Sequence, residues 1–357
     1  MITDNEARAD LFDGDVLILN HHGLGNVVMS LPLLTAVAAR AGGFKVRVLF
    51  ASPECFDLVR DEELALEPVY YRPHFEGFRG LLRLRKAFPG TRVVIGIPQV
   101  PALTVAAVAR TLGASAAAGE TWPGGRWLLS HAAQKGWTTS ILQTQEQIAK
   151  LLGIPTPLGA PSIRVNASDR QWSDAVLQAA GFPGTDVILG VHCSSNITSK
   201  RWPATCFGQV IQSLRTDFPR CGVISFGSSA DRAAADEARS TAGPGLWLEG
   251  TGKWSIRESL AMLKNCTIFL SGDTGLMHMA ASLGVRTLSI FGPTSAARVA
   301  PQYNQGVSIC PATSCHPCYR DRYTPCQCIH TITPERVVAS ARGMLSEAFE
   351  YCSPAQD

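Results

Sequence analysis

The chain has 357 residues, of which 46% are hydrophobic and 17% are charged. This composition excludes a disordered chain and a coiled coil, and the length suggests two domains of about 150 residues with large buried cores. With 32 Lys and Arg against 29 Asp and Glu, the net charge of +3 is too balanced to predict binding to nucleic acid or to a membrane surface.

Three features of the sequence bear on where in the cell the protein is found. Residues 1–15 are acidic and polar and do not match a secretory signal. The most apolar long stretch, 101–119, is rich in alanine and contains Arg110, so it falls short of the ~20 strongly apolar residues of a spanning helix. Eleven cysteines without an export signal are typical of a reducing compartment. We therefore expect a soluble cytoplasmic protein with no transmembrane segment.

Short runs rich in Val, Ile and Leu recur along the chain and are separated by helical patterns. They predict buried parallel strands joined by crossover helices, an α/β fold, at residues 16–19, 46–50, 93–97, 187–191, 223–226, 267–270 and 287–291. The segment 152–161 contains three prolines and predicts a stiff connector. We expect domains at 1–160 and 161–333, followed by a helix and tail at 334–357, with ligands at the carboxyl ends of the strands and a cleft between the halves.

The first glycine-rich loop follows the first predicted strand. Gly23, Gly25 and Asn26 precede a helix predicted through residue 39, and glycines at such a turn let the backbone approach an anionic ligand. Val28 stands where a dinucleotide fingerprint requires glycine. A tight connection without a ligand is the other interpretation. Further on, residues 71–90 predict a basic helix, either a solvated surface helix or one that contacts an acceptor or a membrane.

The second polar loop follows the strand at 187–191. Its Ser, Thr and Asn residues lead to Lys200 and Arg201, and hydroxyls, backbone amides and an ammonium suit a diphosphate. Trp202 and Pro203 then begin the next helix. An ordinary polar loop has the same composition, so both interpretations stay open here.

The third loop is the start of the helix that follows the strand at 267–270. Asp273, Thr274 and Gly275 occupy its first turn, where free amides and the helix dipole favour an anion. His278 lies one turn beyond Thr274 on the same face. Asp273 or Thr274 could instead only cap the helix, and His278 could be a hydrogen-bonded core residue.

Together these segments resemble glycosyltransferase family 9, the ADP-heptose:lipopolysaccharide heptosyltransferases. The matching pieces are 23–27 with Leu31 and Pro32, 200–203, 273–281, 291–294 and the closing segment 328–337. The resemblance implies a glycosyltransferase-B fold of two Rossmann-like lobes with parallel sheets. The N-terminal lobe would bind the acceptor and the C-terminal lobe the nucleotide sugar. It also implies an inverting, metal-independent enzyme that moves a heptose or related sugar from an ADP-sugar, most simply ADP-heptose, to a hydroxyl of a glycan, protein or small molecule.

The resemblance also implies roles for particular residues. Lys200 would neutralise the donor diphosphate, Thr274 and Gly275 would hold it, and Asp273 would order that loop. The further donor-binding residues implied are Ser228, Asp231 and His278, with Gly23 and Gly25 in the acceptor loop.

One position departs from the family. Asn26 stands where the family has the aspartate that deprotonates the acceptor, and an amide cannot take that proton at neutral pH. Either Asn26 positions the acceptor while His21 or His22 is the base, or another carboxylate such as Glu120 enters. The remaining alternative is a changed acceptor or a sugar-nucleotide-binding protein without catalysis. A sugar-nucleotide epimerase could use the same two-domain frame.

Five cysteines lie within nineteen residues, and four of them could form a site: Cys315, Cys318, Cys326 and Cys328, beside Cys310. The first pair has the spacing of a metal knuckle, whereas the C-x-C of the second fits a zinc ribbon poorly. Protein-modifying members of the family resemble this arrangement in carrying iron-binding cysteines. Structural zinc or iron, free thiols and disulfides all remain open, and no cofactor is expected for catalysis.

Overall fold

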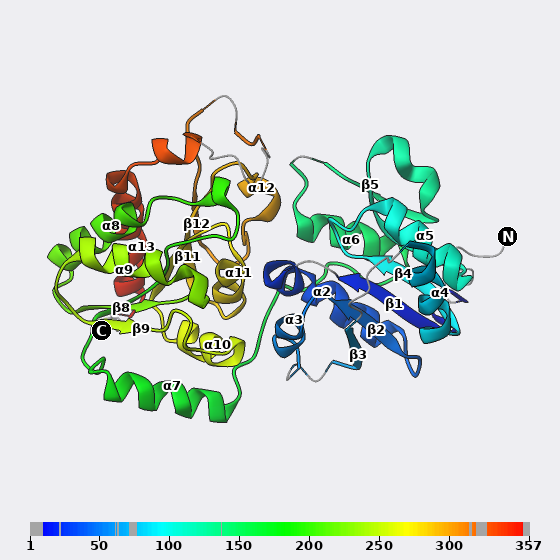
Figure 1. Cartoon of the computed structure of the whole chain (residues 1–357), viewed down its shortest axis with the longest axis horizontal. Coiled ribbons are helices and arrows are strands. Elements are labelled where there is room, and N and C mark those ends of the chain that lie inside the picture. Colours follow the sequence, from blue (N-terminus) through cyan, green and yellow to red (C-terminus); the bar gives the residue numbers. More distant parts are fainter. Residues whose placement is uncertain are drawn as a thin grey trace, which may run out of the picture. The chain divides into compact units, whose positions relative to one another are not determined.

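The computed structural model describes residues 10–20, 23–60, 62, 64–70, 77–136, 138–313, 316–318 and 327–352. By their contacts these residues divide into two compact units between Pro161 and Ser162 (Figure 1). We call them unit 1 and unit 2 and describe each by itself.

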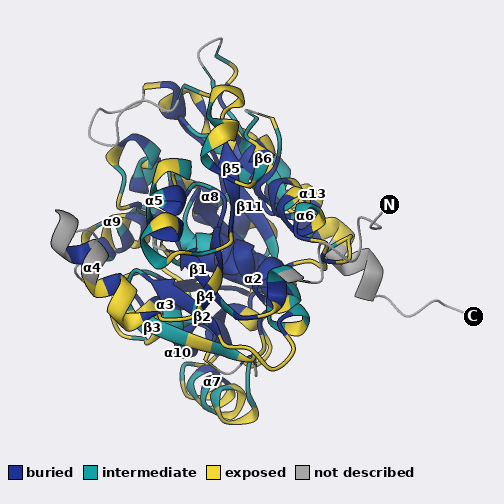
Figure 2. Cartoon of the chain, turned by 90° about the vertical axis from the view of Figure 1, so that its right-hand side faces the viewer, coloured by how far each residue is buried: buried dark blue, intermediate teal, exposed yellow. Residues whose placement is uncertain are grey.

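Unit 1 is built on a six-stranded sheet with the order β3-β2-β1-β4-β5-β6, in which every pair is parallel. The strands are β1 (Asp15–Asn20), β2 (Val46–Phe50), β3 (Leu66–Tyr70), β4 (Thr91–Gly96), β5 (Ala116–Thr121) and β6 (His131–Gln134). The helices are η1 (Asp10–Phe12), α2 (Leu24–Arg40), α3 (Pro53–Asp57), α4 (Gly77–Ala87), α5 (Ala102–Leu112), η2 (Pro123–Leu128) and α6 (Ile141–Leu151). Helix α2 packs on α3 and α6, and α4 packs on α5, so helices cover both faces of the sheet. In Figure 2 the strands of this sheet appear largely buried between them.

Unit 2 repeats this plan with the strand order β12-β11-β10-β7-β8-β9, again all parallel. The strands are β7 (Val187–His192), β8 (Cys221–Ser225), β9 (Trp247–Glu249), β10 (Ile268–Gly272), β11 (Arg286–Ile290) and β12 (Val307–Ile309). The longer helices are α7 (Ala167–Ala179), α8 (Ala204–Asp217), α9 (Arg232–Ala242), α10 (Ile256–Lys264), α11 (Gly275–Ser282) and α13 (Pro334–Cys352). The short ones are η3 (Thr198–Lys200), η4 (Ser229–Asp231), α12 (Ala296–Val299) and η5 (Gln327–Thr331).

The α/β prediction is confirmed: two parallel, helix-covered sheets make the architecture of the glycosyltransferase-B fold. All seven predicted strands exist, because parallel strands are buried on both faces and therefore read as continuous apolar runs. The search for short runs of Val, Ile and Leu did not predict the other five strands, which are β3, β5, β6, β9 and β12. Strand β5 is instructive, since its six residues are buried but begin with three alanines, which have low strand propensity.

The start of α8, which follows the second polar loop, is fixed by the residues next to it. Pro203 is the N-cap of α8, and Trp202 anchors that start, since it is 2% exposed and its ring lies edge-to-face with that of Phe207 at 5.0 Å between centroids. Its indole Nε1 donates to Ile332 O at 2.9 Å, so the loop before α8 is fastened to the chain just before α13. The helix predicted within 71–90 is α4; residues 71–76 lie outside the described ranges. Among the helices of the described residues, none is both long and apolar enough to cross a membrane.

Candidate functional site

The start of α11 is the centre of the candidate site in unit 2. Thr274 is its N-cap with extended backbone (φ −138°, ψ 166°), yet its side chain makes no capping hydrogen bond. Its Oγ1 is buried and, within the described parts of the chain, has no hydrogen-bond partner. The first amides of α11 are therefore not satisfied by the N-cap side chain, and an N-terminus in that state attracts anions.

Lys200 and Asp273 meet beside this helix start. Lys200 Nζ lies 2.5 Å from Asp273 Oδ2, and the hydroxyl of Thr294 donates to the same oxygen at 2.7 Å. These residues follow β7, β10 and β11, whose carboxyl ends lie side by side because β10 pairs with both other strands. Burial alone raises the pKa of the Asp273 carboxyl, but the Lys200 ammonium and the Thr294 hydroxyl hold it below its ordinary value. The carboxylate is therefore ionised and locks the ammonium in place.

His278 lies one turn into α11 and is 3% exposed. Burial lowers the pKa of its imidazole to about 4, against the opposing attraction of Asp273, while Lys200 lowers it further. The ring is therefore neutral at pH 7 and adds no positive charge for a diphosphate. Its Nδ1 is buried and has no hydrogen-bond partner among the described atoms.

The loop after β8 is braced from within. Gly227 has φ +141°, and a Cβ there would lie 3.0 Å from Asp231 Oδ2. Ser228 donates to that oxygen twice, through its amide and its hydroxyl, each at 2.8 Å. Burial raises the pKa of Asp231, but hydrogen bonds from His192 and Ser228 outweigh it and lower the pKa well below its usual range. Asp231 thus holds the loop in shape.

The sequence analysis assigned no role to three residues at this edge, although one of them, Thr294, lies in a segment that resembles the family. They are Thr294, His192, whose Nε2 lies 3.6 Å from Asp231 Oδ2, and Glu249 at the end of β9. Glu249 Oε1 accepts from Ser225 Oγ at 2.6 Å and from the Thr251 amide at 2.8 Å, while Oε2 is buried with no partner in the described atoms. Each ends or follows a strand at the same edge, and that position was the signal that could have found them.

In unit 1, the glycine loop begins α2. Gly23 is the N-cap with φ −72°, so no left-handed backbone is needed there. A Cβ at this position would meet no described atom within 4 Å. Asn26 lies in the first turn and its amide donates to Gly23 O at 3.0 Å. His21 and His22 lie outside the described residues.

Glu120, the alternative base, lies near the carboxyl end of β5 and is buried. Its side chain is 2% exposed and pairs with Lys135 Nζ at 3.3 Å. A carboxylate so enclosed is poorly placed to receive an acceptor proton, because general bases need direct or single-water reach to that proton. Asn20, at the end of β1, is also fully buried and donates to Ser30 Oγ at 3.2 Å.

The cysteine cluster is described only in part, since Cys315 and Cys326 lie outside the described residues. The amide of Cys318 donates to Pro293 O at 3.0 Å, and Cys328 is buried in η5. Within the described residues, no three His, Cys, Asp or Glu side chains gather as a metal site. Among the described residues, Cys310 and Cys318 form no disulfide. The four-cysteine site stays a prediction.

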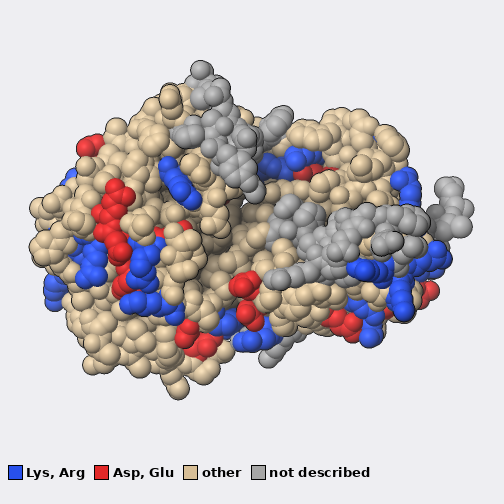
Figure 3. All heavy atoms as spheres, viewed as in Figure 1, with Lys and Arg blue, Asp and Glu red and all other residues tan. Residues whose placement is uncertain are grey.

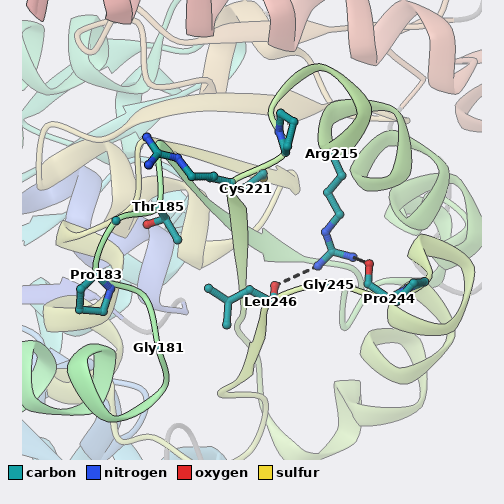
Figure 4. Close-up of a pocket in the computed structure, with 11 residues that line it drawn as sticks. Gly181, Pro183, Thr185, Arg215, Cys221, Pro244, Gly245 and Leu246 are labelled. Carbon is teal, nitrogen blue, oxygen red and sulfur yellow. Dashed lines mark hydrogen bonds between the residues drawn. The ribbon is translucent and has the colours of Figure 1, made fainter.

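A pocket of about 460 Å³ lies elsewhere in unit 2 (Figure 4). It is lined by residues that precede or begin β7, β8 and β9, such as Thr185, Cys221 and Leu246. Arg215 spans it and donates to Pro244 O and Leu246 O at 3.2 and 2.9 Å. The pocket is therefore at the amino ends of the strands, the edge opposite to the candidate site. Ligands of parallel α/β sheets bind at the carboxyl ends.

These features define a class of protein: two Rossmann-like units, the second with an uncapped helix start at the carboxyl edge of its sheet, are typical of glycosyltransferases that use nucleotide sugars. The sequence profile of glycosyltransferase family 9 (heptosyltransferase) matches residues 82–329. Because that match covers more than half of the chain, the protein belongs to glycosyltransferase family 9.

Individual relatives agree with this family. Lipooligosaccharide heptosyltransferase 2 of Haemophilus influenzae is 31% identical over 113 residues, which are 31% of each chain. The chain spans less than two thirds of the length of the curated relatives that it matches most strongly.

Solved structures share the fold. A family 9 glycosyl transferase from Veillonella parvula has a TM-score of 0.74 at 17% identity, covering 94% of this chain and 98% of that one. ADP-heptose lps heptosyltransferase II of E. coli has a TM-score of 0.70 at 18% identity, and the match covers 93% of this chain and 99% of that one. The dodecameric iron-containing heptosyltransferase TibC has a TM-score of 0.60 at 13% identity, and the match covers 94% of this chain and 77% of that one.

Proposed function

We propose that the protein is an inverting glycosyltransferase that moves a heptose or related sugar from an ADP-sugar to an acceptor hydroxyl. The observation that carries the proposal is the uncapped start of α11 at Thr274 beside the Lys200–Asp273 pair. Relatives named as heptosyltransferases, and a fold neighbour named for ADP-heptose, support the donor. Family membership does not favour the alternative of a binding protein without catalysis.

In this proposal the donor diphosphate lies against the first amides of α11 and the hydroxyl of Thr274, with Lys200 balancing its charge. The acceptor oxygen attacks C1 of the sugar from the face opposite the diphosphate, the C1–oxygen bond to the diphosphate breaks, and the configuration inverts. The leaving nucleotide diphosphate is stabilised by fixed donors, each worth roughly 3–4 kcal/mol in comparable sites. Because Lys200 and the start of α11 supply the positive potential, the transfer in this proposal needs no metal ion.

The roles of the two units follow from this placement. Unit 2 binds the donor and residues 1–160 bind the acceptor, with Asn26 positioning its hydroxyl and His21 or His22 taking the proton. Ser228 lies in the loop that contacts the nucleoside, Asp231 braces that loop, and the neutral ring of His278 donates a hydrogen bond to a diphosphate oxygen. The acceptor class is a glycan of the lipopolysaccharide type, with a protein or a small molecule as the alternatives.

Two subsidiary proposals concern the cysteines. Cys206 and Cys310 form no disulfide among the described residues, as is usual in a reducing compartment, and this supports a cytoplasmic location. A structural zinc or iron at Cys315, Cys318, Cys326 and Cys328 remains a second proposal, and the described members alone do not make a site. Metal analysis of the purified protein tests it: a metal-free sample in which all eleven cysteines titrate as thiols contradicts it.

A nucleotide-release assay tests the main proposal. ADP-heptose, ADP-glucose, GDP-sugars and UDP-sugars are offered with a panel of glycan, protein and small-molecule acceptors. We expect ADP release that depends on the acceptor and a product with inverted configuration at C1. Nucleotide release that is independent of acceptor, or tight ADP-sugar binding with no transfer, contradicts it.

A further inference from the structure

The two ends of helix α11 are held in different ways. Its amino end, at Thr274, has no side-chain cap. At its carboxyl end, the Ile163 amide donates to Ser282 O at 3.2 Å, and Lys264 Nζ donates to Leu283 O at 2.7 Å. Both donors belong to other elements of unit 2, and they satisfy carbonyls that a helix leaves without intrahelical partners. The carboxyl end of α11 is therefore fastened to its neighbours.

One of these donors belongs to the connector between the two units. On the side of unit 1, the Ile154 amide donates to Ala149 O at 2.9 Å, and Ile154 is 4% exposed. On the side of unit 2, Ile163 is 5% exposed. The residues between these two positions include three prolines and form a stiff segment. The connector therefore enters unit 2 at the carboxyl end of α11.

Helix α10 holds the connector and α11 together. Arg257, near its start, donates to Arg164 O and from Nε to Asp169 Oδ2, each at 3.2 Å. The Arg257 side chain is only 8% exposed, so its charge depends on that carboxylate. Lys264 lies at the other end of α10, and α10 packs on both α7 and α11. One helix thus fastens the connector with its first turn and α11 with its last.

The charge of Lys264 is too far from the donor site to act on it directly. The eight residues of α11 span about 12 Å, which exceeds the screening length of about 8 Å at physiological ionic strength. Figure 3 shows Lys and Arg intermingled with Asp and Glu over the visible face of unit 2. Loss of one cation therefore changes no large field of one sign. Any influence of Lys264 on the donor has to pass through the position of the helix.

We propose that Lys264 and Arg257 are positioning residues for the donor. By fastening α11 and the connector to α10, they hold the first amides of α11 in the place where the diphosphate binds. A helix start that is already held need not be ordered when the anion binds, so the affinity is higher. Because coupling between two sites is reciprocal, ADP at the start of α11 also stabilises the bond from Ile163 to Ser282 at its end. This inference rests on the donor site of the proposed function.

Hydrogen exchange of the full chain, with and without ADP, tests the coupling. The segment 155–163 contains three prolines, which have no amide hydrogen, so Ile163 contributes a large share of its exchange. We expect saturating ADP to slow exchange of the Ile163 amide by about fivefold, as for coupled sites. A bond with only a structural role would not respond to ADP. Unchanged exchange in the ADP-bound protein overturns the proposal.

Variants of α10 test the effect on donor affinity. Lys264→Met removes the ammonium that bonds Leu283 O and should weaken ADP binding about threefold, whereas Lys264→Arg restores a donor and should keep the native affinity. Lys264→Met/Arg257→Met should weaken binding about tenfold. The KM for the donor should rise in step while kcat stays near the native value, because no group at the diphosphate is changed. Native affinity in both methionine variants overturns the proposal.

Controls separate this inference from its alternatives. Lys150→Met makes the same substitution in the last turn of α6, in unit 1, and should leave ADP affinity unchanged. A loss in Lys264→Met that disappears at high salt is a long-range charge effect and overturns the proposal. Circular dichroism verifies folding, and Lys264→Met alone decides if the double variant is unfolded.

The same titrations distinguish failure of this inference from failure of the proposed function. If the native chain binds no ADP, the proposed donor site is wrong and the inference falls with it. If ADP binds and Thr274→Val weakens it, but Lys264→Met does not, the donor site stands and only the positioning role is overturned.

Discussion

Lys200 Nζ lies 2.5 Å from Asp273 Oδ2, so a cation from the loop after β7 is paired with a carboxylate 73 residues further along the chain. The pair is largely buried, with 17% and 8% of the two side chains exposed. Removing one partner of such a pair leaves the other charge buried and unpaired, which costs folding free energy. A substitution of Lys200 therefore affects the stability of the fold as well as donor binding.

The first prediction separates these two effects. Lys200→Ala should lower turnover at least about a hundredfold, as removal of one preorganised donor does. It should also destabilise the fold by about 3 kcal/mol, because Asp273 is left buried and unpaired. Lys200→Met/Asp273→Asn removes both charges and should recover most of the stability without recovering activity. Urea denaturation and the nucleotide-release assay measure the two quantities; restored turnover in the double variant would end the assignment of Lys200.

The second prediction concerns the hydroxyl of Thr274, which is buried without a partner in the described structure. Thr274→Val keeps the side-chain shape, so stability should be unchanged or slightly higher, since an unsatisfied polar atom is removed. ADP binding should weaken by about tenfold, the value of one hydrogen bond to a charged group. Calorimetric titration measures this.

Thr294→Val is the matched control for that variant. Its hydroxyl donates to Asp273 rather than facing the helix start, so its loss should cost about 1 kcal/mol of folding stability and affect ADP binding less. If the two variants behave alike, the distinction drawn between the hydroxyls is wrong.

The third prediction follows from the pKa of His278, which burial lowers to about 4 from 6.5. Below pH 6.5 the imidazole of His278 is protonated in the unfolded chain but stays neutral in the folded protein, so the free energy of unfolding falls as the pH drops from 6.5 towards 4. Over that window the loss attributable to this residue is about 3 kcal/mol. The Asp273 carboxylate, whose pKa is lowered, loses its contribution only below its unfolded pKa of 3.8, so the two windows are distinct.

Denaturation profiles of the native protein and of His278→Gln from pH 7 to pH 4 measure this. We expect a flatter profile for the variant. Parallel profiles mean that His278 is hydrogen-bonded or solvated when charged, contrary to its buried, unpartnered Nδ1.

The fourth prediction concerns the acceptor base. If His21 or His22 takes the proton, His21→Ala/His22→Ala should lower kcat at least about a hundredfold while ADP binding is kept. Asn26→Asp in that background restores a carboxylate in the first turn of α2 and should recover part of the rate. A double alanine variant with full activity removes both histidines from the mechanism and leaves the base to another group.

Much of this molecule follows from local sequence. The seven apolar runs became strands because burial on both faces demands Val, Ile and Leu, and the Asp273-Thr274-Gly275 turn became a helix start because short residues suit that position. Strand β5 could not be predicted from local sequence, because alanine has a low strand propensity. This strand is buried because it lies between β4 and β6 in the sheet.

The tertiary structure alone decided how the charged groups interact. The sequence determined that Lys200, Asp273 and Thr294 each follow a buried strand, but only the strand order, with β10 between β7 and β11, brings them to one point. The same holds for the neutral state of His278. Local propensity acts over a few neighbouring residues, whereas pairing, burial and pKa depend on groups that meet only when the sheet has formed.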